Sequence, residues 1–335
     1  MAGERGSIAD RCCRLLARLC GRRQAPEPLR DWGWALANIK TLGYELARLT
    51  ASASLPPAPA APPSAGLKSK PCTQADIESG WVAFWCAECG VKPVYVRKWW
   101  EFCYVAQALW DAGMLSPGRR GLGFGCGREP LPSLFAKYGC EIVASDLPAA
   151  TARARKWLAS QQRGADPRTM LYPTICPDPE KLAKVSFREI DMNRIPPELD
   201  GAFDFCWSCC ALEHLGSLEL GRQFIENSLR VLRPGGVAVH TLEFNLDEAG
   251  DTLDRGATVL FQRRHLEAVA DLLASSGHRV AELDFNPGAG LLDGFIDLPP
   301  YDPEILGSAP QPLHLKVSIA GFRCTSFGLI VTRRA

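Results

Sequence analysis

Several features that would place this chain in a special class of proteins are missing. Its 335 residues include 38 basic and 37 acidic side chains, so the net charge of +1 lacks the basic excess of nucleic-acid-binding proteins. No apolar run approaches the ~18 residues that a transmembrane helix needs. The first residues also lack the continuous apolar segment of a signal peptide. We therefore expect a soluble cytoplasmic protein that has no nucleic-acid partner.

Cysteine is too scarce for a disulfide scaffold, with 14 residues in the chain against the roughly 8–10% of such scaffolds. Two CxxC pairs occur, Cys86 with Cys89 and Cys206 with Cys209. A zinc site would need both pairs to converge. Cys206 lies in an expected strand, where residues three apart point to opposite faces. The sequence therefore predicts reduced thiols and no metal site.

Composition divides the chain into three parts. Residues 52–71 are rich in proline and alanine and almost free of large apolar side chains, which is typical of a linker. The extension before it, residues 1–51, holds two helix-like segments, 8–22 and 29–49. Arginines recur along 8–22, which suits contact with a membrane surface or a partner protein, or loose packing on the protein itself. Residues 72–335 remain as the main domain.

Strand-like and helix-like runs alternate through the main domain, which predicts an α/β fold with a mostly parallel sheet. The expected strands lie at 121–124, 141–145, 186–190, 203–208, 237–243, 279–285, 314–320 and 327–332. The expected helices lie at 98–113, 131–138, 149–162, 217–232 and 263–276.

The most informative segment is a glycine-rich loop, Gly123-Phe124-Gly125-Cys126-Gly127, between a short apolar strand and a helix. Glycines let the backbone pass close to a ligand, and a helix N-terminus offers free N–H groups. The next strand ends in Asp146, an acid placed to accept hydrogen bonds from both hydroxyls of a ribose. Together these features predict a cofactor that contains a nucleoside.

Spacing separates the candidate cofactors. The dinucleotide motif GxGxxG fails in both frames, because Arg128 and Pro130 stand where its third glycine would lie. This disfavours a nicotinamide-dependent oxidoreductase, which we keep as a less favoured alternative.

The pattern GxGxG, with Asp146 nineteen residues after Gly127, resembles class I S-adenosylmethionine-dependent methyltransferases. Further matches follow in the family's order: Asp191-Met192 after the third strand, the strand Phe203–Ser208 with Leu212-Glu213-His214 after it, and the turn Leu232–Gly236. The resemblance covers about residues 98–335, and the segment that leads into the loop also resembles a poorly characterised bacterial subset.

This resemblance implies a Rossmann-like domain, with a mostly parallel seven-stranded sheet flanked by helices, and S-adenosyl-L-methionine as the cofactor. Matched residue by residue, the implied cofactor contacts are Gly123, Phe124, Gly125, Gly127, Glu129, Asp146, Leu147, Asp191, Met192 and Ser208.

One position departs from the family pattern. The family usually has an acid two residues before the first glycine, near the methionine amino group, and this chain has Gly121 there. Glu129, just past the loop, is either a substitute that reaches back or a first-turn acid stabilised by the helix dipole. A methyltransferase-like protein that only binds or scaffolds, without catalysis, therefore remains an alternative.

Methyl transfer depends mainly on alignment of the acceptor with the methyl group, and a base is needed only for a hydroxyl or an ammonium acceptor. Glu213 and His214 lie just beyond the fourth strand and are our candidates for that base. His240 and Glu243 on the fifth strand are weaker candidates.

Two segments bear on the acceptor. Residues 81–110 hold nine aromatic side chains, which either pack on the sheet or stack on a substrate. Residues 286–313, with Asp297, Tyr301 and Asp302, form a long Gly/Pro-rich segment of the kind that often covers a site. We expect a small-molecule or glycan acceptor that is methylated at oxygen.

Overall fold

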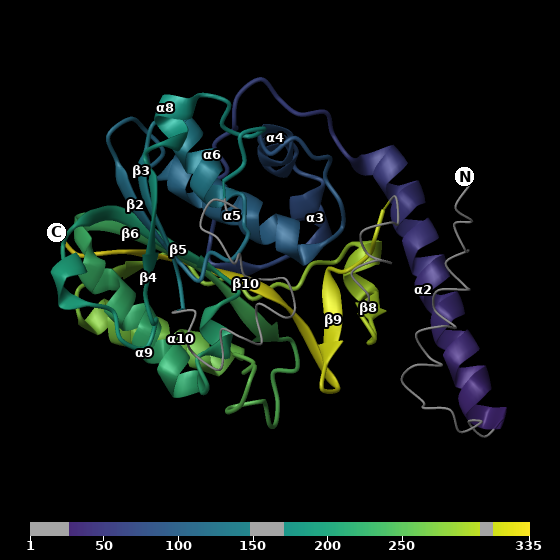
Figure 1. Cartoon of the computed structure of the whole chain (residues 1–335). Helices are drawn as coiled ribbons and strands as arrows, with labels where there is room; N and C mark the ends of the chain where they lie inside the picture. Colours follow the sequence, from purple (N-terminus) through teal and green to yellow (C-terminus); the bar gives the residue numbers. More distant parts are fainter. Residues whose placement is uncertain (1–26, 148–170, 302–310) are drawn as a thin grey trace.

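The computed structural model describes residues 27–147, 171–301 and 311–335 of the chain (Figure 1). Expectations for 8–22, 149–162 and Asp302 lie outside these residues. At the centre is a ten-stranded sheet, in which eight strands follow the order β4-β3-β2-β5-β6-β10-β9-β8 and the other two, β1 and β7, pair with β10. The strands are β1 (Lys70–Pro71), β2 (Arg120–Phe124), β3 (Glu141–Asp146), β4 (Val185–Glu189), β5 (Phe203–Cys209), β6 (Leu232–Asn245), β7 (Arg279–Val280), β8 (Ile296–Asp297), β9 (Lys316–Ile319) and β10 (Phe322–Thr332).

The parallel half of the sheet follows the sequence prediction closely. Strands β4, β3, β2, β5 and β6 pair in parallel, and their bounds lie close to the expected ones apart from β6, which is longer. Every residue of β5 is buried, as expected for a central strand that is covered on both faces. The α/β fold is confirmed, but the expected number of seven strands is wrong because short strands extend the other edge.

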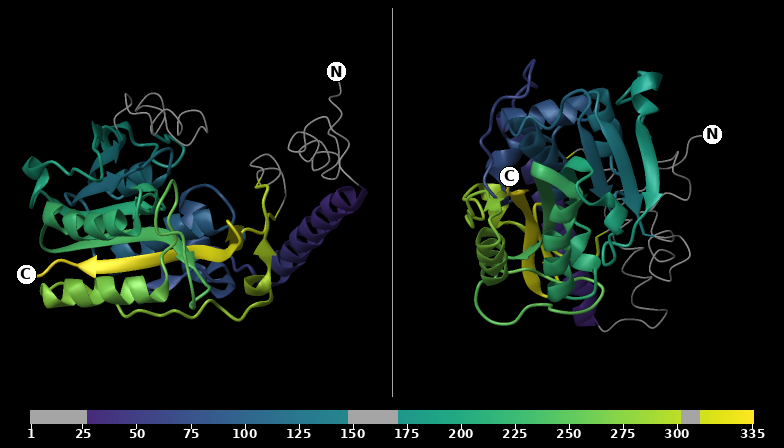
Figure 2. Two further views of the ribbon diagram at one scale, coloured as in Figure 1. Left: turned by 90° about the horizontal axis from the view of Figure 1, so that it is seen from below. Right: turned by 90° about the vertical axis from the view of Figure 1, so that its left-hand side faces the viewer.

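Helices cover both faces of this sheet (Figures 1 and 2). One core cluster packs α4 and α5 against the sheet, and the other packs α9 and α10 against the opposite face. The α-helices are α2 (Glu27–Ser54), α3 (Gln74–Ile77), α4 (Gly80–Glu88), α5 (Arg97–Asp111), α6 (Leu131–Lys137), α8 (Pro179–Leu182), α9 (Leu218–Ser228) and α10 (Arg263–Ser275). Short 3₁₀ turns are η2 (Pro197–Leu199), η3 (Leu212–His214), η4 (Leu229–Val231) and η5 (Leu291–Gly294).

The antiparallel half differs from the sequence prediction. Strand β10 pairs antiparallel with β6 along nine residue pairs, and with β9 on its other side. The expected strand 279–285 pairs with β10 only at Arg279–Val280, and further along Leu283 forms an isolated bridge with Ser69 instead. The N-terminal segment therefore takes part of the edge that residues 281–285 were expected to occupy.

The segment 52–71, which the sequence predicts to be a linker, includes the end of α2 and residues that contact the main domain. Residues that follow α2 lie against the main domain, where Leu55, Ala65 and Leu67 pack on the core. The Tyr104 hydroxyl donates a 2.6 Å hydrogen bond to the carbonyl of Lys68. Proline-rich sequence thus forms an extended strap here, because polar side chains of α5 satisfy its backbone groups.

Helix α2 runs beside β8 and β9 at one end of the molecule (Figure 1). It buries Ala37, Lys40, Tyr44 and Ala47 and leaves Trp32 and Leu42 largely exposed, so only one of its faces packs on the protein. No helix in the described ranges is both long enough and apolar enough to cross a bilayer.

Candidate functional site

A cavity of about 500 Å³ lies at the carboxyl ends of the parallel strands β2, β3 and β5. This is where ligands bind in open α/β sheets, and the volume is in the range of small-molecule pockets. One part of its wall is formed by Gly125, Cys126, Gly127, Arg128, Glu129, Asp146, Leu147, Ile190, Asp191 and Met192. The other part includes Arg97, Lys98, Glu101, Phe102, Cys209, Cys210, Glu213, His214, Glu243 and His314.

The glycine loop forms the floor of the first part. Gly125 and Gly127 have φ values of 62° and 53°, in the left-handed region that favours glycine. A Cβ at Gly125 would stand 2.9 Å from the Cβ of Ala211 and 3.5 Å from the Met192 sulfur. Both the backbone conformation and the close approach therefore require glycine at position 125.

The two acids that follow β3 and β4 also border the cavity. Asp146 ends β3, and its Oδ1 accepts a 2.7 Å hydrogen bond from the N–H of Leu147. Asp191 borders the cavity too, although one of its oxygens already accepts from the N–H of Asn193. Leu147 and Met192 supply apolar surface beside them. These four residues occupy the places that the sequence predicts.

Glu129 reaches back into the cavity. Its carboxylate is buried and accepts a 2.6 Å hydrogen bond from the indole Nε1–H of Trp207. Burial raises the pKa of Glu129 to about 7, against the opposing effect of the Trp207 hydrogen bond. At Gly121 an added Cβ would lie 2.3 Å from the Phe205 ring, so no acid fits there. The structure thus explains the departure at Gly121 and places Glu129 at the cavity.

Three of the expected cofactor contacts do not border the cavity. Gly123 packs under Trp207, and Phe124 is buried in the core against Phe224. Ser208 is buried, and its hydroxyl lies 2.9 Å from Nδ1 of His240, whose Nε2 meets Ser228 at 3.0 Å. Burial lowers the pKa of His240 to about 3, so this candidate base is a neutral core residue.

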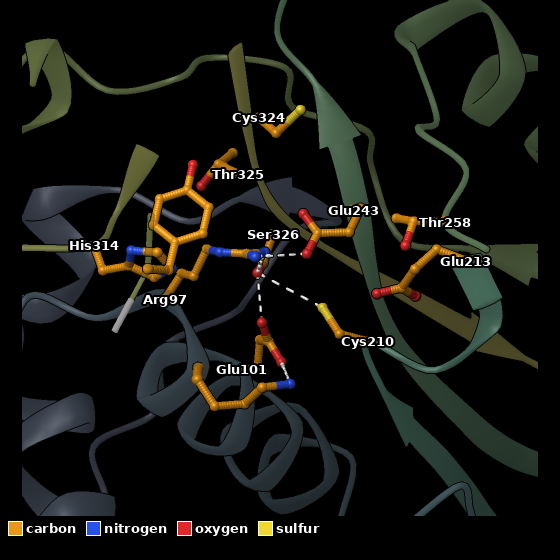
Figure 3. A network of polar contacts seen from close by, with 12 residues as sticks. Arg97, Glu101, Cys210, Glu213, Glu243, Thr258, His314, Cys324, Thr325 and Ser326 are labelled. Carbon is orange, nitrogen blue, oxygen red and sulfur yellow. Dashed lines mark hydrogen bonds and ion pairs between the residues drawn. The ribbon is translucent and has the colours of Figure 1, made fainter. Parts of the chain in front are cut away.

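The second part of the wall contains Glu213, the first residue of interest beyond β5 (Figure 3). Both of its carboxylate oxygens are buried and lack a hydrogen-bond partner. Burial, together with the neighbouring Glu243 carboxylate, raises the pKa of Glu213 well above its usual range. A carboxyl group with that proton affinity is suited to accept a proton near neutral pH.

The basic side chains beside Glu213 are already paired. Arg97 forms an ion pair of 2.6 Å with Glu243, and Lys98 forms one of 2.6 Å with Glu101. All four lie together because Arg97, Lys98 and Glu101 share the first turns of α5, which faces the end of β6. Although burial opposes it, the Lys98 and Arg97 charges hold the pKa of Glu101 below its usual range. The pairs leave this end of the cavity without excess positive charge.

Two histidines border the cavity. Nδ1–H of His214 donates a 2.8 Å hydrogen bond to the carbonyl of Ala257, and its Nε2 lies 3.9 Å from Glu213. His314, just before β9, lies 2.8 Å from Asp297 through its Nδ1. The sequence gives no signal for His314, because nothing near it resembles the motif-bearing segments.

The aromatic side chains of residues 81–110 pack mainly inside the protein. All nine rings belong to one core cluster or pack against it, as in the packing alternative, and Phe102 also borders the cavity. The two cysteines of the second CxxC pair lie in different core clusters: Cys206 belongs to one, whereas Cys209 shares the other with Cys86.

Within the described residues, one group has the atoms to receive a cation. Cys210, Glu213 and Glu243 place their ligand atoms within 4.8 Å of one another. Cys210 has a φ of 47°, which is rare for a residue other than glycine. The Arg97 guanidinium already supplies a positive charge next to Glu243, so this group does not need a metal ion to balance the charge of Glu243.

Comparison with known proteins identifies the domain. Residues 122–240 match a family model described as a methyltransferase domain. Residues 122–240 therefore form a methyltransferase domain, and this assignment supports S-adenosylmethionine as the cofactor. A comparison with curated proteins finds no match.

Several solved structures are similar to this chain at low identity. They include an S-adenosylmethionine-dependent methyltransferase from Mesorhizobium loti (16% identity, 68% of this chain and 98% of that one, TM-score 0.36). They also include phosphoethanolamine N-methyltransferase 2 from Haemonchus contortus (14% identity, 69% and 52%, TM-score 0.39). A third is 1,6-didemethyltoxoflavin-N1-methyltransferase from Burkholderia thailandensis (15% identity, 69% and 76%, TM-score 0.38). At these TM-scores they carry no argument about the substrate.

Proposed function

We propose that this protein transfers a methyl group from S-adenosylmethionine to a hydroxyl oxygen of a small-molecule or glycan acceptor. The observation that carries the proposal is one continuous cavity that joins the glycine loop to the buried, unpartnered carboxylate of Glu213. The first part suits a nucleoside cofactor, and Glu213 suits an acceptor whose proton must be removed.

The residues fit the cofactor. The backbone of Gly125 and Gly127 leaves room for close approach, and Asp146 offers a carboxylate to the ribose hydroxyls. Asp191 and Met192 suit the adenine, and Glu129 suits the methionine amino group. S-adenosylmethionine, when bound, supplies a methyl carbon that is activated by its sulfonium.

Glu213 acts on the acceptor in this proposal. In its carboxylate form it accepts a hydrogen bond from the acceptor hydroxyl and takes the proton as the oxygen becomes methylated. Its raised pKa makes it a stronger base than an exposed carboxylate would be. The α5 wall, with Phe102 and the paired Arg97 and Lys98, excludes water and orients the acceptor.

The paired charges favour an uncharged acceptor. Arg97 and Lys98 each have a carboxylate partner, so an acceptor phosphate would have to compete with Glu243 or Glu101 for them. A polyhydroxy compound or a sugar carries no charge and does not compete with these carboxylates for Arg97 or Lys98. The same pairing supports our expectation that nucleic acid is not the acceptor.

The test is incubation of fractionated cell lysate with methyl-labelled S-adenosylmethionine and the full chain. We expect label in small-molecule or glycan fractions, loss of at least about 100-fold in rate with Glu213→Gln, and an unchanged rate with the surface variant Glu219→Gln. Label chiefly in protein or RNA would contradict the proposed acceptor. Cofactor binding without transfer to any fraction would favour the scaffold alternative.

A further inference from the structure

Behind one wall of the cavity, three side chains from distant parts of the sequence form a continuous polar chain. Lys40 of α2 forms an ion pair of 2.5 Å with Oδ1 of Asp297, and Oδ2 of Asp297 lies 2.8 Å from Nδ1 of His314. Asp297 is fully buried and Lys40 is only 7% exposed. His314 alone of the three borders the cavity.

This arrangement determines the protonation of His314. A carboxylate can only accept, so the neutral imidazole carries its proton on Nδ1 and donates it to Asp297. Nε2 is then left with a lone pair. The edge-on ring of Tyr301, 5.0 Å away between centroids, further fixes the orientation of the imidazole.

Burial and the nearby positive charges keep His314 neutral. Burial lowers the pKa of His314, Asp297 and Glu243 act to raise it, and Arg97 acts to lower it. The Lys40 ammonium forms an ion pair with Asp297, and its positive charge reduces the stabilisation that the carboxylate gives to the imidazolium form of His314. Tyr301 stays an uncharged hydroxyl, because burial raises its pKa to about 12.

We propose that His314 binds a hydroxyl group of the methyl acceptor, with Nε2 as the hydrogen-bond acceptor and with Asp297 and Lys40 as positioning residues. This rests on the proposed function and narrows the acceptor to a compound with a second, uncharged O–H donor, such as a sugar. His314 binds the acceptor at one hydroxyl while Glu213 takes the proton from another.

Lys40 makes this proposal sharply testable, because it touches neither the cavity nor His314. In Lys40→Met the Asp297 charge is uncompensated, so the imidazolium form of His314 is stabilised and Nε2 becomes a donor. Lys40→Arg retains the positive charge and is the conservative rescue. Lys68→Met removes an exposed ion pair with Glu282 and is the matched control.

The first measurement needs no acceptor: ¹⁵N NMR titration of the imidazoles in the full chain, with His314 assigned by His314→Gln. We expect an Nδ1–H tautomer in the wild type, a pKa of His314 raised by about one unit or more in Lys40→Met, and wild-type behaviour in Lys40→Arg and Lys68→Met. His240, which is bonded to two serines, is the internal standard. An Nε2–H tautomer, or no change in Lys40→Met, would overturn the proposal.

The second measurement uses the acceptor fraction that becomes labelled. We expect His314→Gln and Asp297→Asn to raise its KM by about 10- to 100-fold while the Kd of S-adenosylmethionine stays within about twofold. Lys40→Met should raise KM at acidic pH and approach the wild type at alkaline pH. An unchanged KM in His314→Gln contradicts this proposal alone, whereas absence of labelling in every fraction contradicts the proposed function and this proposal with it.

Discussion

The indole Nε1–H of Trp207 donates a 2.6 Å hydrogen bond to the carboxylate of Glu129, and both side chains are buried. Trp207 belongs to the central strand β5, whereas Glu129 precedes helix α6. The hydrogen bond therefore holds an acid that follows the glycine loop in sequence, whereas Gly121 precedes the loop.

We expect Glu129→Gln to weaken S-adenosylmethionine binding by about 1.5–3 kcal/mol, because an ionised partner of the amino group is lost. Since the pKa of Glu129 is raised to about 7, the carboxylate form grows as pH rises through that value. Wild-type affinity should therefore increase from about pH 6 to about pH 8, and the variant should lose this increase. Isothermal titration at several pH values measures both, with the exposed Glu141→Gln as control.

Asp146→Ala should also weaken S-adenosylmethionine binding, by about 1.5–3 kcal/mol, because the ribose hydroxyls lose a charged acceptor. Isothermal titration with S-adenosylmethionine checks this, and circular dichroism confirms that the variant is folded. The exposed Asp271→Ala of α10 serves as control. Unchanged affinity in a folded Asp146→Ala protein would remove Asp146 from the cofactor site.

Glu213→Gln should make the protein more stable at alkaline pH while reducing its activity. An acid whose pKa is raised in the folded state stabilises that state when it is protonated, and this contribution is lost as pH rises through the raised value. Glutamine carries no charge at any pH. The difference in Tm between variant and wild type should therefore be small near pH 5 and should grow toward about pH 9; a pH-independent difference would contradict the assignment.

Gly121→Ala should destabilise the protein by about 1–3 kcal/mol, because its Cβ would overlap the Phe205 ring in the middle of the sheet. Gly294→Ala is the matched control, since its Cβ would meet nothing within 4 Å. Chemical denaturation compares the two. Equal stability of the two variants would mean that the Phe205 ring can shift at little cost in free energy.

Removal of residues 1–71 should lower stability. The truncated chain would leave the fully buried Asp297 without Lys40, and loss of one partner of a buried ion pair costs about 3–5 kcal/mol. Differential scanning calorimetry of residues 72–335 against the full chain measures the loss. A truncated chain of unchanged Tm that still binds S-adenosylmethionine would support the expectation that the extension is merely tethered.

The sequence predicts the parallel half of the sheet and the cofactor side of the cavity because both depend on local pattern. Parallel strands place their carboxyl ends at one edge, so the residues that follow β2, β3, β4 and β5 could be grouped in advance. Glu129, Asp146, Asp191 and Glu213 were found in this way and all border the cavity.

The second part of the cavity wall could not be predicted equally well. Arg97 and Lys98 reach the cavity only because α5 packs across β5, β6 and β10, and His314 because its backbone bridges to Val96. Contacts between segments so far apart in the sequence produce no short-range residue pattern from which they could be predicted. The prediction that Ser208 contacts the cofactor was wrong because side chains alternate between the two faces of a strand. Near the end of β5 this alternation directs the Ser208 side chain toward His240, away from the cavity.

The overlap between a side chain at position 121 and the ring of Phe205 also constrains how this sequence can change over time. An acid can evolve at position 121 only after Phe205 has been replaced by a smaller residue. A smaller residue at position 205 in turn leaves a cavity in the core until position 121 carries a side chain. Each single step is therefore penalised, although the double replacement restores the packing volume. While both residues remain, an acid beside the glycine loop has to come from the residues that follow the loop, where Trp207 holds Glu129.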